Sequence, residues 1–245
     1  MDPNEYELMY QVEDRHWWYR GMETITRAML ERWIIHSPTQ RILDAGCGTG
    51  AAMTTYLAEY GKVTGVDLFP QALGFCRKRN APRLARASVL NLPFAPASFE
   101  LVTSFDVLYE RAVASDVTAL SEFLRVLTPN GRLLLRLPAY DWLRGQHDKS
   151  VHTNRRYTKK LVQKLLEQSG FTVEHLSYVN TFLFPVAVIK RLSERIFPPK
   201  DSQSDLALNA GIFNNILKGV LASEAHFAAH TSLPFGLSVI VVGKK

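Results

Sequence analysis

The chain has 245 residues, enough for one large globular domain that buries its own core without disulfides or a structural metal. Hydrophobic residues make up 47% and charged residues 21% of it, ordinary globular values that exclude a disordered or fibrous protein. The formal charge of +6 allows an anionic partner such as a phosphate-bearing substrate, a nucleic acid or an acidic lipid surface, although so small an excess is more often a solvated surface.

Helical spacing of apolar residues marks the N-terminal region. Leu30 and Ile34 lie one helical turn apart, and the surrounding pattern predicts two helices over residues 6–35. A dense aromatic segment, His16-Trp17-Trp18-Tyr19, interrupts them. We expect residues 1–38 to form an N-terminal helical cap.

Strand and helix patterns alternate after Pro38. Strands are predicted at residues 41–45, 62–66, 83–87, 99–104, 132–137 and 171–178. Helices are predicted at residues 50–60, 70–79, 117–127 and 159–168. This order is typical of an α/β fold, a doubly wound and mostly parallel sheet with helices on both faces. We expect residues 39–178 to form its core.

The C-terminal part departs from this alternation. Residues 179–233 are too long for a hairpin loop, since such connections have about 2–5 residues, so we expect a helical insertion that acts as a lid. The apolar run at residues 237–242 predicts a last strand within the segment 234–245. We expect it to be antiparallel and at the edge of the sheet, because no crossover helix precedes it. All of these parts are expected to form a single domain of residues 1–245.

The clearest local signal is a glycine-rich turn between the first strand and the next helix, Leu43-Asp44-Ala45-Gly46-Cys47-Gly48-Thr49-Gly50. Glycines here let the backbone approach a ligand at the carboxyl ends of the strands. The segment resembles motif I of the class I S-adenosylmethionine-dependent methyltransferases. The resemblance covers residues 39–140 and continues loosely to Gly170. It implies a Rossmann-like domain that binds S-adenosylmethionine, releases S-adenosylhomocysteine, and contacts the cofactor through Asp44, Gly46, Cys47, Gly48 and Gly50.

A dinucleotide-binding fold is the competing interpretation of this turn, because Asp67 follows at about the distance of a ribose-binding acid, some 20 residues on. Two details count against it. The third glycine comes two residues after the second instead of three, and Asp44 would place a carboxylate beside a pyrophosphate. S-adenosylmethionine has no phosphate and carries a cationic ammonium and sulfonium, so the charge favours the methyl donor.

Further cofactor contacts follow from the resemblance. It implies that Asp67 holds both ribose hydroxyls and that Leu68 lies against one face of the adenine. Residues 87–94 resemble the adenine-reading segment, which includes Ser88 and Val89. Ser88 stands where the family usually has an aspartate, and a serine oxygen accepts a hydrogen bond more weakly than a carboxylate does. The end of the fourth strand resembles motif IV, which implies a backbone contact from Phe105.

Methyl transfer requires a nucleophile aligned with the methyl group in a dry pocket, and a base only when the nucleophile carries a proton. We expect Tyr109 and Asp106 near the transfer centre, with helix capping as an equal alternative for Asp106. His147 and His152 are the candidate bases, because a histidine of near-neutral pKa in this loop can accept a proton. Their alternative is a structural role in the loop.

Two groups of charged and aromatic residues could reach the ligands. The face of Trp18 suits a cation such as the sulfonium, and Arg20 suits the methionine carboxylate. Packing of the first helices is the alternative for at least one of the tryptophans. Arg155 and Arg156 suit a phosphate or carboxylate of the substrate, or belong to the ordinary surface.

The two cysteines, Cys47 and Cys76, fit no metal-ligand spacing, and the N-terminus lacks the features of a secretory signal. We therefore expect a reduced, cytoplasmic protein without a bound metal. The most apolar stretch, residues 181–189, is shorter than the roughly 20 residues that span a bilayer. Together with Lys190 and Arg191 it could bind a lipid-linked substrate or touch a membrane, but a lid helix is the favoured interpretation.

The leading functional hypothesis is S-adenosylmethionine-dependent O-, N- or C-methylation of a small-molecule, lipid-type or sugar-type acceptor. A nucleic-acid methyltransferase is less favoured, because the chain has no Asn/Asp-Pro-Pro-aromatic motif and no appended RNA-binding module. A non-catalytic protein that binds the cofactor or serves as a scaffold is the alternative from another class, since folds can be diverted to other roles.

Overall fold

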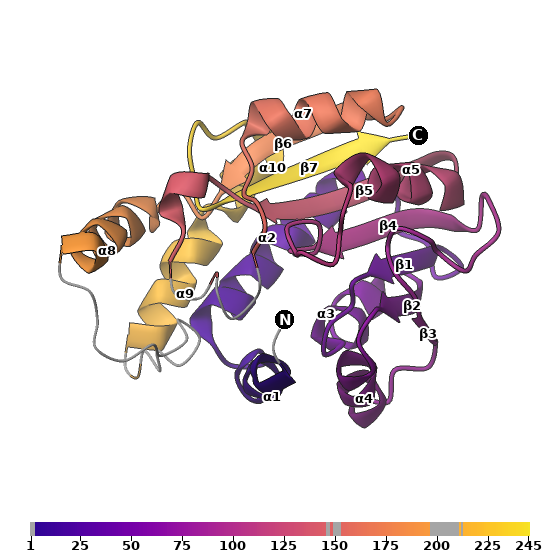
Figure 1. The fold of residues 1–245 in the computed structure, drawn as a ribbon, viewed down its shortest axis with the longest axis horizontal. Helices are drawn as coiled ribbons and strands as arrows, with labels where there is room; N and C mark the ends of the chain where they lie inside the picture. The colour runs from indigo at the N-terminus through magenta and orange to yellow at the C-terminus, as the bar shows by residue number, and fades with distance from the viewer. Residues whose placement is uncertain (1–2, 146–147, 149–152, 197–210, 212) are drawn as a thin grey trace.

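The computed structural model describes residues 3–145, 148, 153–196, 211 and 213–245. A seven-stranded sheet with the order β3-β2-β1-β4-β5-β7-β6 forms its centre (Figure 1). Its strands are β1 (Arg41–Ala45), β2 (Lys62–Asp67), β3 (Leu84–Arg86), β4 (Phe99–Phe105), β5 (Leu127–Pro138), β6 (Thr172–Val179) and β7 (Ser238–Lys244). Neighbours from β3 to β5 pair in parallel, and β7 pairs antiparallel with both β5 and β6. The predicted Rossmann-like, mostly parallel sheet with an antiparallel last strand is confirmed.

The predicted edge position of the last strand is wrong. β7 lies between β5 and β6, which leaves β6 at the edge. The reason is visible in its side chains. Val239 and Val241 pack into the core on one face of the sheet, whereas Ile240 and Val242 pack into the core on the other face. A strand that is apolar on both faces is stabilised by an interior position rather than an edge.

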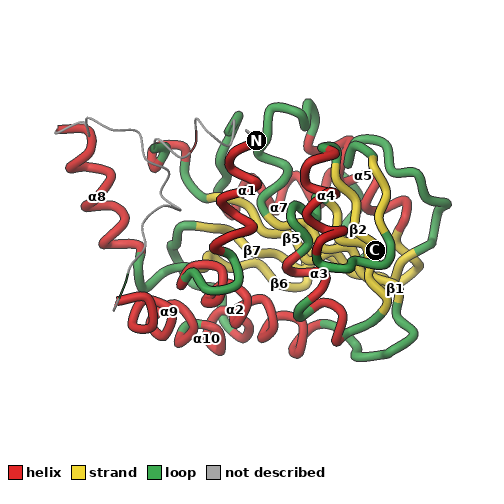
Figure 2. The backbone as a smooth tube through the Cα atoms, turned by 90° about the horizontal axis from the view of Figure 1, so that it is seen from below, coloured by secondary structure: helices red, strands yellow, loops and turns green. Residues whose placement is uncertain are grey.

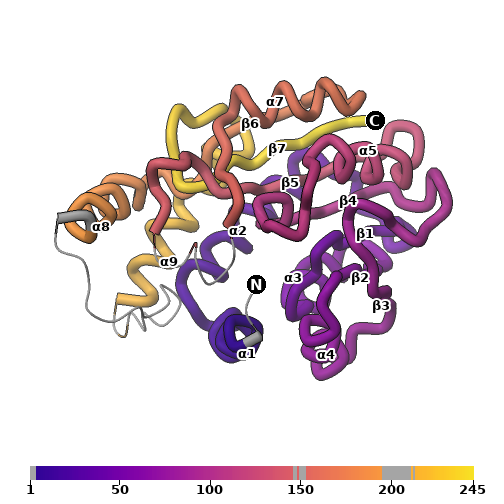
Figure 3. The backbone as a smooth tube through the Cα atoms, viewed as in Figure 1, coloured from indigo at the N-terminus to yellow at the C-terminus, as the bar shows by residue number. Residues whose placement is uncertain are grey.

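Helices cover both faces of the sheet. The core on one face receives α5 (Asp116–Val126) and α7 (Lys159–Gln168). The core on the other face receives α2 (Trp17–Trp33), α9 (Phe213–Ser223) and α10 (Ala225–His230), which lie side by side in Figure 2. Helix α4 (Pro70–Lys78) also contributes to this face, and its outer side contacts α1 (Pro3–Val12). Helix α8 (Phe184–Ile196) lies at the end of the molecule opposite α4 (Figure 3).

The prediction of a single helix over residues 50–60 is also wrong. It is divided into α3 (Ala51–Thr54) and a short 3-10 helix, η1 (Leu57–Glu59), with a break at Thr55. The hydroxyls of Thr54 and Thr55 donate to the carbonyls of Gly50 and Ala51 at 2.8 and 2.6 Å. The backbone N–H groups of both residues still donate to the same carbonyls, but Thr55 leaves the helical conformation, with φ −99° and ψ −86°. Two consecutive β-branched residues have low helix propensity, which favours a break at this point.

One buried carboxylate fixes the segment between β6 and α8. Glu224, which is 0% exposed, accepts hydrogen bonds from the backbone N–H of Thr181 at 2.8 Å and of Phe182 at 3.1 Å, and also from that of Asn180. This contact joins the start of α8 to the α9–α10 junction. No helix in the described part of the chain is both long and apolar enough to cross a membrane.

Candidate active site

A cavity of about 570 Å³ opens at the carboxyl ends of β1, β2, β4 and β5. Its walls come from α1, α2, the glycine turn after β1, the segments that follow β2, β3 and β4, the loop after β5, and α8. Parallel strands bring their carboxyl ends to one side of the sheet, which is why segments distant in sequence meet there.

Most of the predicted site residues line this cavity, namely Trp18, Arg20, Asp44, Gly46, Cys47, Gly48, Asp67, Leu68, Ser88, Val89, Phe105 and Tyr109. Gly50 is not among the lining residues. It precedes α3 with a φ of 85°, and a Cβ there would meet Cys76 Sγ at 2.9 Å, so its contribution is to the conformation of the turn. His147 and His152 lie outside the described residues.

The glycine turn is held tightly against β2. The N–H groups of Gly46 and Cys47 both donate to the Val66 carbonyl, at 2.7 and 2.9 Å. Gly46 has a φ of +84°, and a Cβ at this position would lie 2.2 Å from Val107 Cγ2. Glycine is therefore required here both by the backbone conformation and by the close approach of the neighbouring segment.

Asp67 joins the end of β2 to the glycine turn. Its carboxylate is 7% exposed and accepts from the Gly48 N–H at 3.0 Å and from the Phe69 N–H at 2.9 Å, one on each oxygen. Burial raises the pKa of this carboxyl, and the backbone donors oppose the rise. A carboxylate oxygen can accept two hydrogen bonds, so each oxygen keeps capacity for one hydroxyl of a vicinal diol. This donor set fits a ribose.

Asp44 places a second buried carboxylate beneath the turn. It is 2% exposed and accepts a hydrogen bond from Thr103 Oγ1 at 2.9 Å. Burial raises the pKa of Asp44 to about 7, opposed by the Thr103 bond and the Arg136 charge and increased by the charge of Asp67. A ligand with a positive group here would favour the ionised carboxylate, whereas a pyrophosphate would meet two acids. The residues present therefore fit S-adenosylmethionine better than a dinucleotide.

The adenine side of the predicted site is less polar. Leu68 is 36% exposed and lines the cavity beside Ser88 and Val89. The Ser88 oxygen accepts from the Leu90 N–H at 3.2 Å, so part of its hydrogen-bonding capacity is used within the chain. The hydroxyl keeps one donor and one further acceptor position for a ligand.

A buried arginine that sequence reasoning missed lies in the wall of the cavity. Arg136 is 8% exposed, and its Nε and Nη2 lie 2.8 and 2.7 Å from Asp106 Oδ2. Its Cζ lies 5.2 Å from the ring centroid of Trp18 and 5.1 Å from that of Phe105. The one available signal was a charged residue within the apolar run 133–137, near the carboxyl end of the predicted strand.

Asp106 belongs to the cavity and not to a helix cap. It lines the cavity with a φ of 56° and pairs with Arg136, whereas the side chain of Ser115 caps the following helix, α5. Helix capping by Asp106 is therefore wrong. Tyr109 lies nearby and is 6% exposed. Burial raises the pKa of its phenol far above the ordinary value, with the charges of Asp106 and Glu110 adding to the effect, so the hydroxyl can donate a hydrogen bond but stays protonated at neutral pH.

The paired arginines after β5 stabilise the loop and are not free surface residues. Arg155 Nη2 donates to the carbonyls of Leu108 and Val113 at 3.2 and 2.7 Å. Arg156 binds both carboxylate oxygens of Asp148, at 2.9 and 3.0 Å. Because Asp148 itself is buried and also accepts from a backbone N–H, the loop is tied at this point without a ligand.

The aromatic segment at the start of α2 combines both interpretations given by the sequence. Trp17 and Trp18 pack against the core and also line the cavity. His16 caps α2 by accepting from the Trp18 N–H at 3.3 Å. Arg20 reaches the cavity wall, but its side chain is 37% exposed and pairs with Glu23.

Helix α8 forms the outer wall of the cavity. Leu183, just before it, and Val186 and Ala187 within it line the cavity with Lys190 and Arg191. Ile189 and Leu192 of α8 face outward, with exposed fractions of 67% and 48%, whereas Phe184 packs against Tyr140, Trp142 and Phe235. The cavity thus changes from acidic near the glycine turn to apolar and basic near α8.

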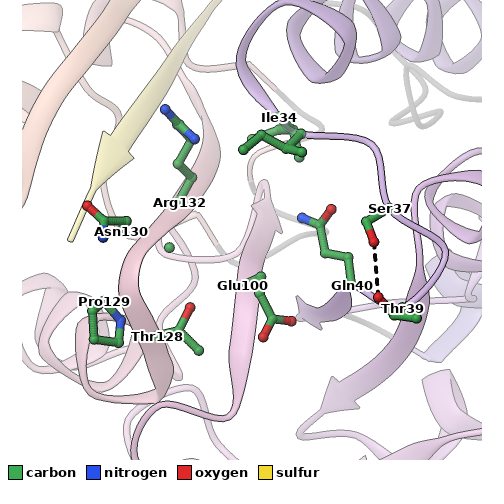
Figure 4. Close-up of a pocket in the computed structure, with 11 residues that line it drawn as sticks. Ile34, Ser37, Thr39, Gln40, Glu100, Thr128, Pro129, Asn130 and Arg132 are labelled. Atoms are coloured by element: carbon green, nitrogen blue, oxygen red, sulfur yellow. Dashed lines mark hydrogen bonds between the residues drawn. The ribbon is translucent and has the colours of Figure 1, made fainter.

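A smaller hollow of about 360 Å³ lies at the opposite side of the sheet, at the amino ends of β1, β4 and β5 (Figure 4). Some of its polar side chains are paired within the chain. Arg41 binds Glu100, and the hydroxyls of Ser37 and Thr39 lie 3.0 Å apart in a hydrogen bond. The predicted site residues lie elsewhere, so this hollow is not the candidate site.

Comparisons with known proteins agree with the geometry. A family model described as a methyltransferase domain matches residues 43–135, which run from the glycine turn to β5. An uncharacterised methyltransferase of Synechocystis sp. is 40% identical over 114 residues, 45% of this chain and 52% of that protein. A demethylmenaquinone methyltransferase of Deinococcus radiodurans is 34% identical over 141 residues, 53% of this chain and 54% of that protein. The chain thus spans about half the length of these curated relatives.

The similarity to solved structures covers more of the chain. A protein of Thermotoga maritima, described as an S-adenosylmethionine-dependent methyltransferase and possible histamine N-methyltransferase, matches with a TM-score of 0.60 and 18% identity. The match covers 99% of this chain and 95% of that one. At this identity the likeness is one of fold, and it extends over the helices outside the family model.

Proposed function

Because the chain belongs to the class I S-adenosylmethionine-dependent methyltransferases, we propose that it transfers a methyl group from S-adenosylmethionine to a small-molecule, lipid-type or sugar-type acceptor held in the cavity. When bound, the cofactor supplies a methyl group activated by attachment to a sulfonium. The chain's own residues bind and orient the two partners and exclude water between them.

The observation that carries the proposal is the pair of buried carboxylates, Asp44 and Asp67, on either side of a turn that requires Gly46. The first suits the cationic end of the cofactor and the second suits its ribose diol. We propose that the remaining predicted residues act with them: Cys47, Gly48, Leu68, Ser88, Val89, Phe105, Trp18 and Arg20 as further contacts, and Gly50 through the conformation of the turn.

In this proposal the N-terminal cap excludes water from the cavity. Met9 of α1 approaches the glycine turn so closely that a Cβ at Gly48 would lie 3.2 Å from its methyl carbon. The Tyr6 ring packs against Phe69, with 6.2 Å between ring centroids. Removing water strengthens the electrostatic interactions of the reacting groups, so a cap in this position serves catalysis as well as binding.

We infer the chemistry of the acceptor from the residues that line the cavity, because the similar proteins are named for different acceptors. One is named for demethylmenaquinone and a solved structure is described as a possible histamine N-methyltransferase. The acceptor side is mainly apolar, with Tyr109 as a hydrogen-bond donor and Lys190 and Arg191 at the α8 end. We propose a lid role for residues 179–233 in a single domain, with His147 and His152 as the candidate bases if the nucleophile carries a proton.

The decisive test is calorimetric titration of the purified protein with S-adenosylmethionine and, in parallel, NAD. We expect binding of the methyl donor alone. Replacing Asp67 with alanine should weaken it by roughly a hundredfold or more, because two charge-assisted hydrogen bonds to the ribose are lost. Glu100→Gln, which changes an acid at the opposite side of the sheet, should bind like the wild type.

Two results would contradict the proposal. Binding of NAD alone would mean that the glycine turn serves a dinucleotide, and unchanged affinity in Asp67→Ala would place the cofactor elsewhere. A panel of acceptors with labelled methyl donor then separates catalysis from the scaffold alternative, which predicts no methylated product from any acceptor.

A further inference from the structure

Arg136 has hydrogen-bonding capacity that the protein itself does not use. Its Nε and Nη2 are held by Asp106 Oδ2 at 2.8 and 2.7 Å. Within the part of the chain that the structure describes, Nη1 has no hydrogen-bond partner. The side chain is nevertheless only 8% exposed, and what remains accessible lines the cavity. Because Nη1 is not among the fully buried atoms without a partner, its N–H groups are open to the cavity and can donate to a ligand there.

The neighbours of Arg136 fix its orientation. Trp18 and Phe105 lie 5.2 and 5.1 Å from Cζ and pack against the guanidinium, while Asp106 holds one edge. A guanidinium immobilised in this way loses little further freedom when it binds a planar anion through its remaining N–H groups. Carboxylate and phosphate oxygens match this geometry, whereas a cation would be repelled.

We propose that Arg136 is the anion-binding residue of the cavity and that it receives a carboxylate or phosphate oxygen of a bound ligand. This inference rests on the proposed function for the identity of the ligands. Two sources have the required chemistry: the carboxylate of the methionine part of the donor, and an acidic group on the acceptor.

Other basic residues of the cavity are less suited to this role. Arg20, which the sequence suggested for the methionine carboxylate, is 37% exposed in its side chain and pairs with Glu23. Arg156 already binds both oxygens of Asp148. Arg191 lies 2.7 Å from Glu194. Arg136 differs from all three because it is buried, fixed by aromatic rings, and still has an unused donor.

The variants for the test are chosen to separate anion binding from folding. Arg136→Gln removes the charge but leaves Asp106, which is half-buried, without its partner, so the double variant Asp106→Asn/Arg136→Gln provides a neutral pair as well. The matched control is Arg132→Gln on the same strand. Arg132 does not line this cavity, and its Nε lies 2.6 Å from Glu174 Oε2. Arg20→Gln tests the competing residue.

Each variant is titrated calorimetrically with three probes: S-adenosylmethionine, its decarboxylated analogue, and inorganic phosphate. The phosphate titration is run with and without saturating S-adenosylhomocysteine. If the anion is the donor carboxylate, Arg136→Gln should weaken S-adenosylmethionine binding roughly tenfold to a hundredfold and the decarboxylated analogue less than about threefold. If the anion belongs to the acceptor, both donor affinities stay unchanged and phosphate binding is lost in Arg136→Gln and in the double variant.

The inference is overturned if Arg136→Gln and the double variant match the wild type with all three probes, or if Arg20→Gln alone reproduces the loss. Failure of the proposed function is distinguishable, because a wild type that binds neither donor would contradict that function directly. In that case the phosphate titration without cofactor still decides whether Arg136 forms an anion site. Loss of phosphate binding in Arg136→Gln would support the site, and binding equal to the wild type would refute it.

Discussion

Two regions share the cavity. The donor side, as we call the part proposed to bind the methyl donor, is formed mainly by residues 43–69. Backbone pairing of β1 with β2 and the bond from the Gly48 N–H to the Asp67 carboxylate hold it together. The acceptor side, the part proposed to bind the acceptor, is assembled from α2, the end of β5, α8 and α9, and its contacts join residues as far apart as Trp17 and Asn214. The first is fixed by local backbone geometry, and the second by packing between distant segments.

This difference suggests how the two sides tolerate change. On the donor side a side chain added at Gly46 meets neighbouring atoms at once. On the acceptor side α8 presents Val186 and Ile189 with exposed fractions of 64% and 67%, so substitutions there meet few constraints from the core. We therefore expect the donor side to be rigid and intolerant of substitution, and the acceptor side to accommodate variation in what it binds.

The largest expected effect comes from Gly46→Ala, which tests the rigidity of the donor side. The substituted residue would have an unfavourable positive φ, and its Cβ would lie 2.2 Å from Val107 Cγ2. We expect a loss of about 2–4 kcal/mol in the free energy of unfolding and loss of S-adenosylmethionine binding. Chemical denaturation and calorimetry measure the two effects.

Gly74→Ala is the matched control for this change. A Cβ at Gly74, inside α4, meets no atom of the described residues within 4 Å. Because alanine has a higher helix propensity, this variant should be as stable as the wild type or more stable by up to about 1 kcal/mol. Equal stability of the two variants would contradict the view that the donor side is geometrically fixed.

The contrast between the two regions also explains what could be predicted from the sequence. The parallel sheet and the glycine turn follow from patterns within short segments, and for that reason the fold was predicted correctly. Asp44 and Asp67 lie within or directly after strands whose order is regular. They were found by the same local reasoning and lie together in the cavity. Their assigned roles in binding stay predictions until titrated.

Other features depend on contacts that no short segment contains. The role of Arg136 depends on Trp18 of α2 and on Phe105 and Asp106 at the end of β4, two segments that meet Arg136 only in the folded chain. The position of β7 depends on burial of both its faces by distant helices. The early end of α3 depends on the backbone conformation of Thr55, which the helical spacing of apolar residues does not reveal.

A second prediction concerns the pH dependence of the donor side. Burial raises the pKa of Asp44 from an ordinary 3.8 to about 7. Between these values the folded chain binds a proton that the unfolded chain has released. The contribution of Asp44 to stability therefore falls as pH rises from about 4 to about 7 and is constant above that range. Asp44→Asn removes this dependence, so the variant should become more stable than the unliganded wild type as pH increases.

Cofactor binding should change in the opposite direction. The ionised carboxylate attracts a cationic ligand, so wild-type affinity for S-adenosylmethionine should increase through the same pH range, while Asp44→Asn should bind weakly with a flatter profile. Thermal unfolding and calorimetry at several pH values measure the two trends. A variant that loses both stability and affinity at every pH would indicate that Asp44 has a structural role only.

The smallest expected effect, confined to the acceptor side, comes from Glu224→Gln. Glu224 Oε2 accepts from the backbone N–H groups of Thr181 and Phe182, and Oε1 accepts from that of Asn180, so the NH₂ group of a glutamine would face at least one of these donors. We expect a loss of about 1–3 kcal/mol, because a buried N–H becomes unsatisfied. Hydrogen exchange should accelerate at residues 180–182 and in α8, while the S-adenosylmethionine affinity stays within about threefold of the wild type.

The outcome of this experiment decides whether the two sides are energetically separate. If residues 43–48 also lose protection, or if donor affinity falls more than about tenfold, the acceptor side must support the glycine turn through the helices α2 and α9 that pack against each other. The rigidity of the donor side would then depend on the packing of α2 against α9 as well as on its own backbone hydrogen bonds. Unchanged protection there would mean that α8 can shift, and that different acceptors can be admitted, without cost to the binding of the methyl donor.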